Sequence, residues 1–243
     1  MARPTSSKRP RASAEDVTLD LPPFPGFDRK GFQFLKEIAQ NNVREWLTDE
    51  RKAIYRDHLV EPMKQLLGEL RMRFAEEGLP YTPDPTASLF RLYRDTRFSK
   101  DKRPFKTNIG AVVPFRGEGK DGLGNYLHIQ PGSCFYGGGA YFMEPAGLRS
   151  LRERLAADPA AFRKILAKVE KEFSPLQGEK LKRGPAGYEK DHPAMDLLLY
   201  TQMWISKQFP DRLAMSRELV DWIVEMSRKS LEFNTYLYDA IRG

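Results

Sequence analysis

The sequence is poor in cysteine and histidine, which excludes several kinds of site. Its single cysteine, Cys134, excludes an internal disulfide framework and any metal site built on several cysteines. The three histidines, His58, His128 and His192, are far apart, and no two have the spacing of metal ligands. We therefore expect no metal and no cofactor, and we expect Cys134 to be a buried, unreactive thiol.

Long apolar runs are also missing. No stretch reaches 18 apolar residues, and residues 1–11 are basic and polar with no apolar segment behind them. We therefore expect neither a membrane-spanning helix nor a secretory signal, no membrane partner, and a cytoplasmic location. With 40% apolar and 12% aromatic residues, a chain of 243 residues has enough material for a substantial core.

Positive charge is concentrated in two places. The net charge is +7, but residues 1–14 contain four basic side chains and no acid, so the remainder carries only +3. Within that remainder, residues 91–106 hold seven basic side chains and two acids, a local charge of +5. This distribution favours a focused anion site over a broadly basic face.

Hydrophobic periodicity predicts an α+β fold. Residues 1–21 are expected to form a disordered basic tail, and residues 22–243 a single domain. A mainly antiparallel sheet is expected at about residues 85–143, with a later strand near 200–209, packed against N-terminal and C-terminal helices. The last helix is expected to begin near Ser216 and continue to about Ile241.

Several residues have the spacing of helix caps or turns. Asp28 and Asp158 are predicted N-caps, the second followed by a proline in the first helical turn. Asn42 with Glu45 has the form of a capping box. Gly137-Gly138-Gly139 has neither the following Lys-Ser/Thr nor the helix of a phosphate loop, so a strand bulge or turn is favoured.

Arg94 breaks the pattern of its predicted strand. Alternation over residues 89–98 places it on the same face as Phe90 and Leu92. An arginine on an apolar face is either paired with a carboxylate or lines a pocket, because burying it alone is costly. The sequence suggests three carboxylates as its partner without ranking them, namely Asp95, Glu144 and Asp196.

The segment from Arg94 to Lys106 has the side chains that a phosphate or carboxylate site needs. Arginine forks bind oxyanions bidentately, and lysines add point charges. The predicted ligand-binding residues are Arg94, Asp95, Arg97, Ser99, Asp101, Lys102 and Lys106. The two aspartates would hold the arginines in place or bind a divalent cation. The alternative is a solvated basic loop with local ion pairs.

The same loop resembles a known family. It reads Arg-Asp-Thr-Arg-Phe-Ser-Lys-Asp-Lys-x-Pro-Phe-Lys, is preceded by Asn41-Asn42-x-x-x-Trp46, and is followed by Tyr126-x-His128-Ile129 and Gly184-Pro185-x-Gly187-Tyr188-x-x-Asp191-His192-Pro193. These motifs are similar to those of the family catalogued as domain of unknown function 2461, over about residue 24 to the C-terminus. The resemblance implies a shared fold and a shared site, but it implies no reaction. The matching loop residues are Arg94, Asp95, Arg97, Phe98, Ser99, Asp101, Lys102, Pro104, Phe105 and Lys106.

Three functions remain open from the sequence. The first is the binding of a small anionic ligand, with or without catalysis, for which His128 and Asp95 are the candidate catalytic residues. The second is nucleic-acid binding through the basic tail and loop, with stacking on Phe98, Phe105, Tyr126 and Tyr136. The third is a protein-interaction module whose basic loop docks an acidic partner. The oligomeric state is left open.

Overall fold

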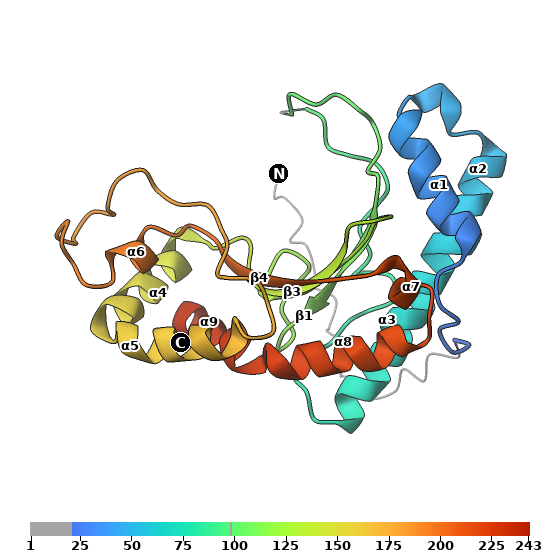
Figure 1. Cartoon of the computed structure of the whole chain (residues 1–243). Helices are drawn as coiled ribbons and strands as arrows, with labels where there is room; N and C mark the ends of the chain where they lie inside the picture. Colours follow the sequence, from blue (N-terminus) through green and yellow to red (C-terminus); the bar gives the residue numbers. More distant parts are fainter. Residues whose placement is uncertain (1–20, 98) are drawn as a thin grey trace, which may run out of the picture.

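The computed structural model describes residues 21–97 and 99–243 (Figure 1). The predicted tail therefore lies outside the described residues, apart from Leu21, and so does Phe98. A four-stranded antiparallel sheet in the order β1-β2-β3-β4 is flanked by helices, which confirms the predicted α+β class. The strands are β1 (Ile109–Pro114), β2 (Gly124–Ile129), β3 (Cys134–Ala140) and β4 (Met203–Phe209).

The N-terminal helices begin where the sequence indicates. The Asp28 carboxylate accepts a hydrogen bond from the Gly31 N–H at 2.8 Å, as predicted for the N-cap of α1. The proline at position 62 lies in the first turn of α3, directly after a short π-helical segment. The elements of this region are α1 (Arg29–Gln40), the 3₁₀ helix η1 (Arg44–Trp46), α2 (Asp49–Tyr55), the π-helical η2 (Arg56–Val60) and α3 (Glu61–Glu76).

The predicted capping box at Asn42 is wrong. No side-chain cap opens η1, and the Asn42 side chain instead binds the backbone of Phe105, 63 residues away. A side-chain amide can satisfy both an N–H and a C=O of a distant strand-like segment, and here that interaction replaces the local cap.

The C-terminal half supplies most of the remaining helices. The Asp158 side chain accepts a hydrogen bond from the Ala161 N–H at 3.0 Å, which confirms the second predicted cap. The predicted final helix is divided into α8 and α9 at Ser230. The helices are α4 (Pro145–Ala157), α5 (Pro159–Val169), α6 (Met195–Leu198), α7 (Asp211–Ala214), α8 (Glu218–Lys229) and α9 (Leu231–Arg242).

The three glycines at 137–139 form neither a bulge nor a turn. They lie inside β3 and pair in unbroken register with β2 and β4. A Cβ added at Gly138 would come within 2.2 Å of the Asn125 amide oxygen, so this glycine allows a buried polar group to approach the strand. Close packing beneath the strand thus accounts for the glycine at position 138.

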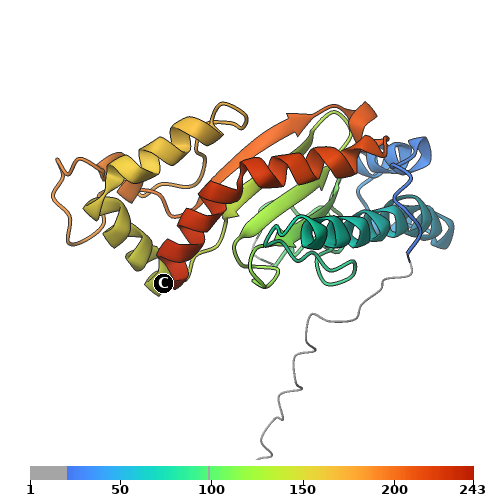
Figure 2. The ribbon, with the colours of Figure 1, turned by 90° about the horizontal axis from the view of Figure 1, so that it is seen from below.

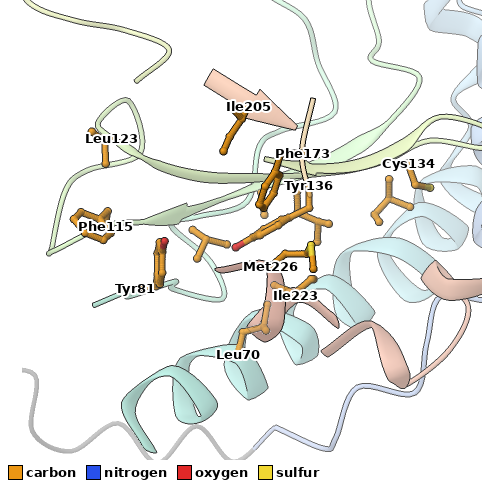
Figure 3. Packing of buried hydrophobic residues seen from close by; sticks show 14 of the residues in the cluster. Leu70, Tyr81, Phe115, Leu123, Cys134, Tyr136, Phe173, Ile205, Ile223 and Met226 are labelled. Atoms are coloured by element: carbon orange, nitrogen blue, oxygen red, sulfur yellow. The ribbon is translucent and has the colours of Figure 1, made fainter. Parts of the chain in front are cut away.

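The main core lies between one face of the sheet and helices α3, α8 and α9 (Figures 1 and 2). Figure 3 shows Leu70 of α3 with Ile223 and Met226 of α8 beneath Tyr136 of β3. On the opposite face, the β2 side chains Tyr126 and His128 are only half-buried, which gives β2 its alternating burial. Among the described residues, no helix is long and apolar enough to cross a membrane.

Candidate functional site

Residues 88–97 and 99–108 form the two sides of a hairpin arm that continues from the edge of the sheet (Figure 1). At its base, the Phe90 N–H donates to the Gly110 carbonyl at 3.0 Å. Further out, the Arg94 N–H donates to the Pro104 carbonyl at 2.9 Å, and the Lys106 N–H donates to the Leu92 carbonyl at 2.8 Å. These bonds fix which residues of the basic segment face each other across the arm.

Asn42 fastens the arm to the N-terminal helices. Its side-chain nitrogen donates to the Phe105 carbonyl, and its side-chain oxygen accepts from the Phe105 N–H, both at 3.0 Å. Phe105 itself is 1% exposed. The middle of the arm, at Phe105, is therefore held beside Asn42, which directly precedes the segment that opens η1.

Arg94 pairs with Asp101 across the arm, and its side chain is 27% exposed. The three partners suggested by the sequence are therefore wrong. Asp95 bonds Arg97, Asp196 bonds Arg163, and Glu144 is the N-cap residue of α4. In the hairpin, Arg94 faces Pro104. Asp101 is only three residues before Pro104, so this register brings its carboxylate close to the Arg94 side chain.

Asp101 holds two guanidinium groups at once. Besides its bond to Arg94, it accepts from Arg103 Nη2 at 2.7 Å. Hydrogen bonds from Arg103, and then from Arg94, hold the pKa of the Asp101 carboxyl well below its usual range. The carboxylate is therefore ionised near pH 7, and it orients both arginines.

A groove of about 410 Å³ lies between the arm and the η1 segment. Its lining residues are Asn42, Val43, Arg44, Glu45, Tyr93, Arg94, Thr96, Lys102, Arg103 and Pro104. Four of these are cations and one is an acid, so even with Asp101 beside them the groove carries a net positive charge. We call this feature the arm groove.

The other residues predicted for the anion site lie apart from this groove. Asp95 and Arg97 form an exposed pair with Nη2–Oδ2 at 2.7 Å, and the hydrogen bonds from Arg97 lower the pKa of Asp95 to about 2. Ser99 is half-buried near the tip. Lys106 points elsewhere, and its ammonium nitrogen is 4.8 Å from the ring centroid of Phe90.

His128, the candidate acid or base, lies on β2 and is electrostatically coupled to Lys106. Its Nδ1 is 3.3 Å from the Tyr126 hydroxyl, its Nε2 is 3.1 Å from the Gln130 side-chain oxygen, and its ring stacks on Phe135. Burial lowers the pKa of the imidazole and the charge of Lys106 lowers it further, whereas the bond to Gln130 opposes them. The ring is therefore neutral near pH 7.

The sequence analysis did not identify Lys120, a second cation that lies beside Lys106 against the Phe90 ring. Lys120 Nζ lies 4.4 Å from the same Phe90 ring, although it comes from the glycine-rich connection between β1 and β2. A single lysine in a polar loop carries no pattern that would point to this position. Only the folded arm, which brings Phe90 beside that connection, reveals it.

Two residues expected to stack on nucleic acid are in the core. Phe105 and Tyr136 are 1% and 0% exposed, so neither ring is available to a base. Tyr126 is half-buried on the face of the sheet that is opposite the main core. Cys134 is buried as predicted, and burial raises the pKa of its thiol to about 12.

Comparisons with known proteins add a family but no relative of described activity. Residues 30–236 match the family described as "Conserved hypothetical protein (DUF2461)". No curated protein and no solved structure matches the chain. Within the described residues, no group of three or more His, Cys, Asp or Glu side chains is placed to hold a metal ion.

Proposed function

Because the chain belongs to the DUF2461 family of conserved hypothetical proteins, whose description names no activity, we propose a function from the geometry of its own residues. The protein binds a small anionic ligand, a phosphate or a carboxylate, in the arm groove. One observation carries this proposal: Arg94 and Arg103 are held by the single carboxylate of Asp101 at the wall of a groove where cations outnumber acids.

The shared carboxylate favours binding for two reasons. It neutralises only one of the two positive charges, so the pair retains an attraction for an anion. It also restrains two long side chains, which reduces the rotamer entropy lost when a ligand is bound. Guanidinium groups then offer fixed pairs of N–H donors, which match the geometry of phosphate and carboxylate oxygens.

Arg44 and Lys102 add two more positive charges to the groove, one from each side. Lys102 comes from the arm and donates to the Thr96 carbonyl at 2.9 Å, whereas Arg44 comes from η1. An ammonium that donates one hydrogen to a carbonyl keeps two for a ligand. The nucleic-acid alternative is less favoured, because two of its four proposed stacking rings are buried.

Isothermal titration calorimetry with inorganic phosphate, pyrophosphate, adenosine monophosphate and succinate tests the proposal. We expect at least one probe to bind. Arg94→Gln should weaken that binding about tenfold or more, because it removes one charged hydrogen-bonding partner of the anion. Arg97→Gln is the matched control, because Arg97 is on the same arm but pairs with Asp95 outside the groove lining. The proposal fails if no probe binds, or if the two substitutions weaken binding equally.

A further inference from the structure

A second cluster of cations lies by the half-buried face of the sheet, apart from the arm groove. Lys106 and Lys120 both place their ammonium groups against the ring of Phe90, at 4.8 and 4.4 Å from its centroid. Lys106 comes from the arm and Lys120 from the connection after β1, where its Nζ donates to the Leu89 carbonyl. Both lysines are half-buried.

No carboxylate among the described residues forms an ion pair with either lysine, in contrast to the arginines at the tip of the arm. The charges that act on Lys106 are those of Lys120 and Arg91, both positive. Burial first, and then these two cations, lower the pKa of Lys106. A desolvated lysine beside other cations has more of the neutral amine, which is its nucleophilic form.

Groups able to carry protons lie beside Phe90, the ring that both lysines contact. The Phe90 ring makes an edge contact with Tyr126, with centroids 5.7 Å apart. The Tyr126 hydroxyl lies 3.3 Å from His128 Nδ1 and accepts from the Asn108 amide at 3.4 Å. Gly110 makes this possible, because a Cβ at that position would come within 2.3 Å of the hydroxyl.

We propose that Lys106 is an amine nucleophile that forms an imine with the carbonyl group of a small 2-oxo acid, whose carboxylate is bound by Lys120. The amine lone pair forms a bond to the carbonyl carbon while the C=O π electrons move to oxygen. The nitrogen then loses a proton and the oxygen gains one, which gives the neutral carbinolamine. Its hydroxyl takes up a second proton and leaves as water, and loss of the remaining N–H proton gives the imine. Tyr126 and His128 supply and accept these protons.

Reductive trapping tests this inference on the full chain. The protein is incubated at pH 7 with glyoxylate and sodium cyanoborohydride, which reduces an imine to a stable secondary amine, and the modified lysines are located by peptide mass spectrometry. We expect Lys106 to be modified at least tenfold faster than Lys102, which is exposed on the same arm. Lys106→Arg, which keeps a cation beside Phe90, is expected to abolish the fast reaction without changing the melting temperature.

The role of Lys120 is tested separately with Lys120→Gln and two probes, glyoxylate and neutral acetaldehyde. The ratio of the two trapping rates at Lys106 cancels any change in the fraction of neutral amine, and we expect it to fall about tenfold in the variant. Equal labelling of Lys106 and Lys102 in the parent protein would overturn the nucleophile, and an unchanged ratio would overturn carboxylate binding by Lys120. Arg94→Gln should leave trapping unchanged, since the two sites are independent.

Discussion

At the scale of single residues, the neutral ring of His128 makes stability depend on pH. Burial lowers its pKa in the folded protein from the ordinary value of 6.5, so the unfolded chain binds a proton more readily than the folded one. The free energy of unfolding that depends on His128 is therefore fully present above about pH 6.5 and falls as the pH drops through the lowered folded pKa.

His128→Gln tests this sign, because glutamine keeps a polar group on β2 but does not titrate. We expect the difference in unfolding free energy, parent minus variant, to be constant above pH 7.5, to decrease as the pH falls below about 6.5, and to level off below the lowered folded pKa. Urea unfolding at half-unit pH steps measures this difference, which cancels the titration of groups that the two proteins share. A difference that grows on acidification would show that the folded imidazole prefers its charged form.

At the scale of elements, the arm depends on a single side chain for its attachment to η1. Replacing Asn42 by alanine leaves the N–H and C=O of Phe105 without their side-chain partners. We expect Asn42→Ala to lower the free energy of unfolding by about 1–3 kcal/mol, the usual cost of unsatisfied backbone groups at a poorly hydrated position. Chemical denaturation followed by circular dichroism measures this loss.

Asn41→Ala is the matched control for this prediction. Asn41 is adjacent in sequence, but its side chain bonds the Glu37 carbonyl at the exposed end of α1. An exposed backbone carbonyl can bond water instead, so its loss is expected to cost about 0.5 kcal/mol or less. If both substitutions cost the same, Asn42 does not anchor the arm.

Local patterns were predictable from the sequence, whereas the contacts that build the sites were not. The caps at Asp28 and Asp158 act within three residues, and the alternation that marks β2 lies within one strand, so the sequence contains the whole signal. Asn42 has an equally plausible local role, which a contact 63 residues away overrides. The sequence predicts that Arg94 is either paired with a carboxylate or lines a pocket, but the choice of Asp101 follows from the hairpin register.

At the scale of the whole molecule, a buried polar network joins distant parts of the chain beneath the sheet. Asn234 of α9 donates to the Tyr81 hydroxyl at 3.0 Å and to the Asn125 side-chain oxygen of β2 at 2.7 Å. Asn125 in turn donates to the Tyr136 hydroxyl at 2.9 Å, which lies 2.7 Å from Ser227 Oγ of α8. Such a network couples the segment after α3, the sheet and the C-terminal helices.

This coupling predicts that residues 22–243 unfold as one cooperative unit. Trp46 in η1 reports on the N-terminal helices, and Trp222 in α8 reports on the helix that packs beneath the sheet. The chain has a third tryptophan, Trp204 of β4, so the test uses two variants, one that keeps only Trp46 and one that keeps only Trp222. In each variant, we expect the fluorescence transition in urea to coincide with the far-ultraviolet circular dichroism transition. Adding Asn234→Ala should lower the unfolding free energy by about 1–3 kcal/mol in both variants, because it leaves buried polar groups unpaired. Separate transitions, or a loss detected only through Trp222, would instead show that the N-terminal helices unfold independently of the sheet.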